Sequence, residues 1–264
     1  MKNMRVRSAR NWTNETNKST NFKDATMSFR KEKFMSLAGI TAVEHPIEEL
    51  KSISRGLLND GIHGICFSAY DEGQQPGDQL TEAQVRRKLS ILKPHISWVR
   101  TFSCTEGNEF IAQIAHEMGI KTLAGAWLGD DLEKNEVEIA GLIALCKQGA
   151  VDVAAVGNEV LYREDLEANA LVKYIERVKA EVSGVPVGYV DAYYEFTDHP
   201  EVSDACDIIL ANCYPYWEGC ALDYSLMYMK QMYMEAKIAG KGKPVLITET
   251  GWPSSGQSIG GAHA

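Results

Sequence analysis

Residues 153–159 read Val-Ala-Ala-Val-Gly-Asn-Glu, and residues 244–253 read Pro-Val-Leu-Ile-Thr-Glu-Thr-Gly-Trp-Pro. Each stretch starts as an apolar run of strand length and turns polar at a glutamate, Glu159 in the first and Glu249 in the second. A short run of consecutive apolar residues is typical of a strand that is buried on both faces, as in a parallel sheet. The two stretches therefore predict buried parallel strands that each lead into a carboxylate.

Similar strand-like runs recur along the chain from Gly61 onward, and helical patterns fall between them. Strands that alternate with helices predict an α/β fold with a parallel sheet. No glycine-rich phosphate fingerprint follows the first strand, which favours a (β/α)8 TIM barrel over a doubly wound sheet. The runs centre near Ile65, Trp98, Leu123, Ala154, Val187, Ile209 and Leu246, and the helices are expected at 46–58, after a capping box at Thr81 and Gln84, after a cap at Asn108, and over 132–147, 165–182 and 224–239.

Only seven strands can be counted, and the stretch from Gly61 onward is shorter than the ~250 residues typical of such barrels. We therefore expect a barrel truncated after the seventh strand. Residues 1–33 are polar, charged and rich in asparagine, and they are predicted to be a disordered leader. Residues 34–264 are predicted to form a single barrel domain whose C-terminal end is missing.

Composition narrows the classes of partner. The formal net charge is −9 with no basic stripe, so a nucleic acid is not expected. No apolar run reaches the ~18–20 residues of a membrane span. The six histidines lack the spacing of metal ligands, so neither a metal nor a cofactor is expected. The six cysteines contain no CxxC pair and are expected to be free thiols, although a loop bridge between Cys213 and Cys220 stays open.

Polar and aromatic residues follow the predicted strands. The carboxyl ends of barrel strands share one face, where active sites lie. Two carboxylates there can cleave a glycosidic bond, because one gives a proton while the other attacks the sugar. Sugar rings stack on aromatic side chains, and their hydroxyls need polar partners. Besides the catalytic candidates Glu159 and Glu249, the expected substrate-binding residues are Tyr70, Arg100, Trp127, Asn158, Asp191, Asn212, Tyr214, Trp217 and Trp252.

Some of these positions have two interpretations. Arg100 either keeps Glu249 ionised through a charge-assisted hydrogen bond or forms a structural ion pair. Trp217 and Trp252 either bind sugar or cover the top of the barrel. Trp98 lies within a strand and is expected in the core.

Four motifs resemble those of a known family. Gly157–Val160 and Ile247–Ser254 are similar to the two signatures of glycoside hydrolase family 17, which holds β-1,3-glucanases and related glucanosyltransferases. Gly64–Tyr70 and Val99–Phe102 resemble the first-strand and second-strand motifs of its bacterial and fungal members. The resemblance runs over about 61–261.

The resemblance implies a retaining hydrolase of β-1,3-glucan with Glu159 as acid/base and Glu249 as nucleophile. It implies that Tyr70 and Asn158 line the subsite before the scissile bond, and that Tyr214 orients Glu249. The expected partner is a β-glucan oligosaccharide or polysaccharide, and the oligomeric state is open.

Rival functions stay open at this point. The first is transglycosylation in place of hydrolysis. The second is a non-catalytic glucan-binding module or an inactive truncated barrel. A barrel lyase or aldolase would need a lysine or a metal cluster at the strand ends, and the sequence places neither there. The lack of a convincing signal peptide favours a cytoplasmic location, whereas a polymeric glucan substrate favours a secreted or periplasmic one.

Overall fold

The computed structural model describes residues 45–264, so the predicted leader over residues 1–33 lies outside the described residues. The described chain divides into two compact units. The larger unit consists of residues 45–212 and 233–249, and the smaller one of residues 213–232 and 250–264. The whole sheet belongs to the larger unit.

The sheet holds seven strands in sequence order, and each strand pairs in parallel with the next. All seven predicted strands are therefore confirmed, and their order matches that of a (β/α)8 barrel. The strands are β1 (Ile62–Cys66), β2 (Ile96–Arg100), β3 (Lys121–Ala126), β4 (Val153–Asn158), β5 (Val187–Ala192), β6 (Ile208–Asn212) and β7 (Val245–Glu249).

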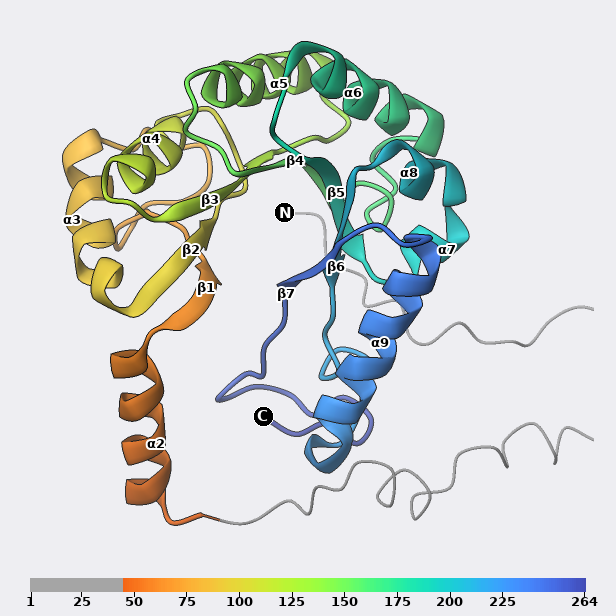
Figure 1. Cartoon of the computed structure of the whole chain (residues 1–264). Coiled ribbons are helices and arrows are strands. Elements are labelled where there is room, and N and C mark those ends of the chain that lie inside the picture. The colour runs from red at the N-terminus through yellow and green to blue at the C-terminus, as the bar shows by residue number, and fades with distance from the viewer. Residues whose placement is uncertain (1–44) are drawn as a thin grey trace, which may run out of the picture. The chain divides into compact units, whose positions relative to one another are not determined.

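Helices follow successive strands, and those between β1 and β6 lie along the convex side of the sheet (Figure 1). The predicted helices are present, with the start of the one expected at 165 moved to Ala168. The helices are α2 (Ile47–Asp60), α3 (Glu82–Leu92), η1 (Lys93–His95), α4 (Glu109–Glu117), α5 (Leu132–Lys147), α6 (Ala168–Glu181), α7 (Glu195–Asp198), α8 (Pro200–Ala205), η2 (Leu222–Tyr224) and α9 (Ser225–Ala239).

Two predicted helix caps differ from expectation. Thr81 caps α3 by accepting from the backbone N–H of Gln84, but the Gln84 side chain donates to the carbonyl of Ala69 (2.8 Å) instead of returning to the cap. Asn108 is the N-cap residue of α4 as expected, but its side chain makes no cap bond and donates to the Thr105 carbonyl (2.9 Å) and to the Tyr70 hydroxyl (3.4 Å). Both side chains thus reach the segment that follows β1, and Asn108 also holds the segment that follows β2.

Two apolar clusters lie on opposite faces of the sheet. The inner cluster is built from strand residues alone, whereas the outer one joins the sheet to α3 and α4. β4 and β6 are buried at every residue, as expected for parallel strands covered on both faces. Trp98 is partly buried and packs against the inner cluster, which consists of Leu123, Val153, Ala155, Val190, Ile208 and Leu210.

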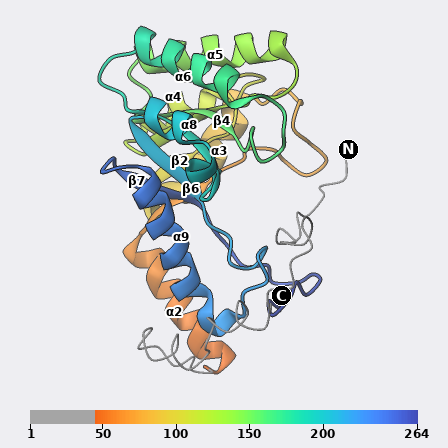
Figure 2. The ribbon, with the colours of Figure 1, turned by 90° about the vertical axis from the view of Figure 1, so that its right-hand side faces the viewer.

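Helix α2 differs from the other helices of the larger unit. It projects away from the sheet (Figure 2), and none of its residues is buried. The predicted apolar face of Ile47, Leu50, Ile53 and Leu57 is therefore exposed to solvent. Within residues 45–264, no helix combines the length and the apolar character that crossing a bilayer requires.

Close packing of strands makes a prediction about Gly188 in β5. A Cβ at this position would meet the carbonyl oxygen of Ile208 at 2.5 Å and a methyl group of Leu210 at 2.9 Å. We expect Gly188→Ala to lower the free energy of unfolding by about 1–3 kcal/mol, because the neighbouring strand must move. Urea unfolding followed by circular dichroism measures this change.

Gly56 of α2 is the matched control, because nothing lies within 4 Å of a Cβ added there. Gly56→Ala should leave the unfolding midpoint unchanged or raise it, since alanine stabilises a helix relative to glycine by roughly 0.5–1 kcal/mol. Equal midpoints for Gly188→Ala and the wild type would contradict the packing argument.

Candidate active site

A strained turn carries Glu159. Gly157 has φ +88° and Glu159 has φ +53°, both in the left-handed region. A Cβ at position 157 would meet Val160 at 2.8 Å, so the turn needs glycine there. The backbone N–H of Glu159 donates to the carbonyl of Val190 on β5 (2.8 Å). A left-handed residue other than glycine is costly, and such conformations cluster at functional sites.

Register irregularities lie next to both glutamates. Between β6 and β7 the pairing shifts after Ala211, so that Asn212 lies opposite Glu249. Between β4 and β5 the pairing shifts between Ala155 and Asn158, directly before Glu159. Bulges of this kind turn side chains in new directions near active sites. Both candidate acids therefore stand where the regular sheet ends.

A network of side chains connects four strand ends. Arg100 at the end of β2 donates through Nη1 to Oε1 of Glu249 and through Nη2 to Oδ1 of Asn158 (2.5 Å). Asn212 donates through Nδ2 to Oε1 of Glu159 (2.9 Å). Arg100 is 5% exposed, so its charge-assisted bond to Glu249 is shielded from water. The structure thus gathers Arg100, Asn158, Glu159, Asn212 and Glu249 into one site.

The two carboxylates have different environments. Burial raises the pKa of Glu159, and the negative charge of Glu249 raises it further, whereas the bond from Asn212 lowers it. Glu249 in turn is paired with the Arg100 guanidinium. Two nearby acids with unlike surroundings are suited to separate roles, one as proton donor and one as anion.

The first and last strands approach each other beside this site. The Cys66 thiol donates to the carbonyl of Thr248 (3.2 Å) and lies 3.7 Å from Nη1 of Arg100. The hydroxyl of Thr248 donates to Oδ1 of Asn212 (2.9 Å). Contacts between side chains and the backbone therefore link β1 to β7 at the carboxyl ends of the strands.

Strand β5 supports the Glu159 turn from behind. The Tyr189 hydroxyl accepts from the backbone N–H of Leu161 (2.9 Å) and donates to the Asp191 carboxylate. Asp191 also accepts from the backbone N–H of Tyr162 (3.3 Å). Asp191 was expected to bind substrate, but it is 0% exposed, which leaves no surface for a sugar. Burial raises the pKa of Asp191 to about 7.

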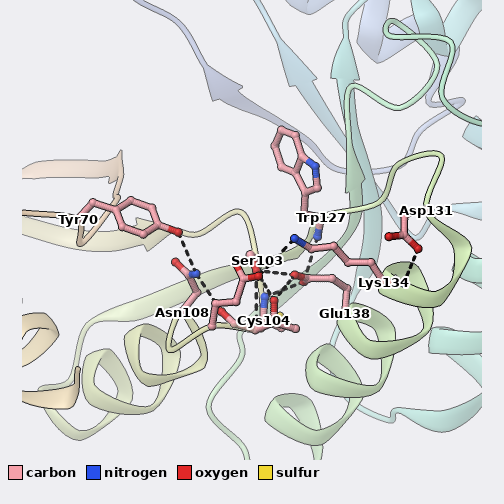
Figure 3. Close-up of polar contacts among 10 residues, drawn as sticks. Tyr70, Ser103, Cys104, Asn108, Trp127, Asp131, Lys134 and Glu138 are labelled. Atoms are coloured by element: carbon pink, nitrogen blue, oxygen red, sulfur yellow. Dashed lines mark hydrogen bonds and ion pairs between the residues drawn. The ribbon is translucent and has the colours of Figure 1, made fainter. Parts of the chain in front are cut away.

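A cavity of about 280 Å³ opens at the ends of β1, β2 and β3. Phe102 joins it to the acid site, because the Arg100 guanidinium lies 4.4 Å from the centre of its ring. Figure 3 shows a polar cluster at this place, with Tyr70 to its left and the Trp127 ring above it. The cavity is lined by Phe67, Ser68, Tyr70, Pro76, Gly77, Phe102, Ser103, Glu106, Asn108, Trp127, Lys134 and Glu138.

Trp127 is also connected to the acid turn. The Arg163 guanidinium lies 4.6 Å from the centre of the Trp127 ring and donates to the carbonyls of Asn158 and Leu128 (3.0 Å to Leu128). Sequence reasoning missed Arg163. It follows Glu159 by four residues, but only the fold shows that its side chain reaches back over the strand end.

The smaller unit holds the remaining expected platforms. The ring of Tyr216 packs edge-on against the rings of Trp217 and Trp252, with distances between ring centres of 5.1 Å and 5.3 Å. Trp252 also donates through its indole N–H to the carbonyl of His263 (2.7 Å). The expected roles of Tyr214, Trp217 and Trp252 at the sugar stay predictions. All six cysteines, including Cys213 and Cys220, are free thiols.

Comparison with known proteins gives the family. The profile of the BtgE/BtgC glycoside hydrolase domain matches residues 64–264. The chain belongs to this family. Its resemblance to glycoside hydrolase family 17 is confirmed by the β-1,3-glucanosyltransferase of Rhizomucor miehei, solved in complex with laminaritriose. That structure is 30% identical, with a TM-score of 0.69 over 78% of this chain and 77% of that one.

Curated relatives of the family are similar over much of the chain. A glucan 1,3-β-glucosidase of Candida albicans is 28% identical, and the match covers 65% of this chain and 63% of that protein. A glucan 1,3-β-glucosidase of Schizosaccharomyces pombe is 27% identical, and the match covers 84% of this chain and 74% of that protein. The chain thus spans less than two thirds of the Candida relative's length.

The burial of Asp191 predicts an unusual titration. Its carboxyl carbon, observed by NMR, should titrate with a midpoint of about 7. Because the folded state holds this proton more tightly than the unfolded chain, Asp191 contributes stability at acidic pH that is lost as pH rises toward 7. Asp191→Asn should remove the resonance and this part of the pH dependence.

Asp204 is the internal comparison, because its ion pair with Lys241 lowers its pKa. It should titrate below the usual range of an aspartate. An Asp191 midpoint close to that of an exposed aspartate would show that its carboxyl is not held in a dry environment.

Proposed function

We propose that this chain cleaves or transfers β-1,3-linked glucan by a retaining mechanism, with Glu159 as acid/base and Glu249 as nucleophile. The single observation that carries the proposal is the pairing of unlike environments at the strand ends. Glu159 is partly desolvated and held by an asparagine, whereas Glu249 is held by a buried guanidinium. A retaining mechanism requires the two carboxyl groups about 5–5.5 Å apart.

The proposed reaction has two steps. Glu159 protonates the glycosidic oxygen while a carboxylate oxygen of Glu249 attacks the anomeric carbon, and the leaving sugar departs as an alcohol. Glu159, now ionised, then takes a proton from water or from an acceptor hydroxyl. That oxygen attacks the anomeric carbon and releases Glu249, so the configuration is retained after two inversions.

The residues around the pair have supporting tasks in this proposal. Asn212 orients Glu159, and Arg100 orients Glu249. Asn158 is fixed by Arg100 and offers its amide N–H groups to a sugar hydroxyl. Asp191 acts through the backbone of the Glu159 turn, without contact to substrate.

The cavity beside Phe102 suits a sugar ring. Aromatic side chains can stack on the apolar face of the ring, with Tyr70 and Trp127 as the candidates. Ser103 and Asn108 supply polar groups for its hydroxyls. The known complex of the Rhizomucor relative with laminaritriose supports a β-1,3-glucan as the ligand.

The proposal includes both hydrolysis and transfer of the glycosyl group, because relatives with each activity match the chain. The curated relatives are glucosidases, whereas the Rhizomucor protein is a glucanosyltransferase. The two differ in whether water or a sugar hydroxyl accepts the glycosyl group. Products longer than the substrate at high laminari-oligosaccharide concentration would assign transfer.

Covalent trapping tests the nucleophile. A 2-deoxy-2-fluoro laminaribioside with an activated leaving group should label Glu249. The fluorine slows both steps, but the activated leaving group speeds formation of the glycosyl-enzyme, so this intermediate forms faster than it is hydrolysed. Peptide mass spectrometry locates the label. Glu249→Gln should lower kcat by on the order of 10³-fold or more while laminaritriose still binds.

Glu176→Gln is the control, since this glutamate is exposed on α6. It should keep wild-type turnover. A label on any other residue would overturn the assignment of Glu249. A wild-type protein that binds laminaritriose without turning it over would favour the non-catalytic module.

The raised pKa of Glu159 predicts the alkaline side of the pH profile. Glu159 must be protonated to donate, so kcat/KM should fall as pH rises through a pKa above the ordinary value of about 4.3. With an aryl glycoside whose leaving group needs no proton, Glu159→Gln should lose this alkaline decline. A decline that persists in Glu159→Gln would assign the proton to another group.

A further inference from the structure

Glu138 on α5 is a buried carboxylate that collects hydrogen bonds from two separate loops. Its Oε1 accepts from the hydroxyls of Ser103 (2.5 Å) and Thr105 (2.7 Å) in the segment after β2. Its Oε2 accepts from the backbone N–H of Cys104 (2.8 Å) in the same segment and of Trp127 (3.2 Å) after β3. Figure 3 shows these bonds converging on one side chain.

No ion pair holds this buried carboxyl group within the described part of the chain. Glu138 is 0% exposed, and the four donors that hold it are neutral. A buried carboxylate is costly unless its oxygens are satisfied, and here each oxygen has two donors. Removing a carboxylate oxygen would leave its donors without an acceptor, which also costs free energy. The carboxylate therefore fixes its partners rigidly.

The helix repeats this arrangement one turn earlier. Asn135 is also buried, and its side chain accepts from the N–H of Gly129 (2.9 Å) and donates to the carbonyl of the same residue (2.8 Å). Asn135 and Glu138 interrupt the otherwise apolar stripe of α5. Both polar positions thus hold the segment that begins at Trp127.

The bonds of Glu138 end on the walls of the cavity. Ser103 and Trp127 line it, and the Trp127 ring is held on its other side by Arg163. The candidate acids Glu159 and Glu249 are not among the partners of Glu138. Its effect is therefore on the shape of the cavity and not on the reacting carboxylates.

We propose that Glu138 is a positioning residue that sets the geometry of the glucan-binding cavity, by fixing Trp127 and the segment 103–105 at the spacing a sugar ring needs. The inference rests on the proposed function. Glu138 stands in the cavity wall but has no exposed surface for the sugar to touch, so it acts through how firmly Trp127 and Ser103 are held when the ring binds. Preorganised walls favour binding because the side chains and loops lose little conformational entropy when the sugar binds.

Glu138→Gln tests this proposal, because it keeps the shape of the side chain while an amide N–H₂ replaces one acceptor. Laminaritriose binding is measured by calorimetry in the inactive Glu249→Gln background, with and without Glu138→Gln. We expect Kd to rise about tenfold, equivalent to about 1.4 kcal/mol. In Glu138→Gln alone, KM should rise similarly, while kcat stays within about threefold and the pH profile is unchanged.

Glu133→Gln is the matched control, since it makes the same chemical change at an exposed position in the first turn of α5. It should leave Kd and KM at wild-type values. If Glu138→Gln fails to fold, Thr105→Val carries the test, and it should raise Kd about threefold because one bond to the carboxylate is lost.

The outcomes separate this inference from the proposed function. A wild type that turns over glucan, together with an unchanged Kd in folded Glu138→Gln or in Thr105→Val, overturns the positioning role alone. A fall in kcat or a displaced pH profile without a change in Kd also overturns it. A wild type that neither binds nor cleaves laminari-oligosaccharides overturns the proposed function and this inference with it.

Discussion

The buried guanidinium of Arg100 is the constraint on which the site depends. It donates to Glu249 on β7 and to Asn158 on β4, two strands that are not neighbours in the sheet. A buried cation must be paired, because an unpaired charge in a dry environment is strongly destabilising. The pairing therefore fixes the distance across the strand ends, and the sugar chemistry we propose uses that fixed distance.

The same strands have a regular part that forms the sheet and an irregular end that forms the site. Up to Ala155 and Ala211 the pairing is regular and the strands are filled with apolar side chains. Beyond these points the register shifts, the backbone enters the left-handed region at Glu159, and polar side chains replace apolar ones. The regular part supplies rigidity, and the irregular ends use it to hold strained and polar groups in place.

The strands and most of the acid network could be predicted because local sequence carries them: a buried parallel strand is apolar throughout, and a polar residue directly after it must lie at its end. The tasks of Glu138 and Arg163 could not, since they depend on which loop lies opposite a given helix turn or strand end. Polar residues on the apolar stripe of α5 were the available signal for Glu138. Asp191 was misjudged because position at a strand end does not distinguish a surface group from a buried support.

The sequential strand order has a consequence for how the protein becomes competent during synthesis. Neighbouring strands are neighbours along the chain, so a growing sheet can add one βα unit at a time as the polypeptide leaves the ribosome. Glu159 is present once four strands have formed, yet its counterpart on β7 arrives three strands later. A partly assembled chain therefore holds only one of the two acids, and the reaction we propose needs both.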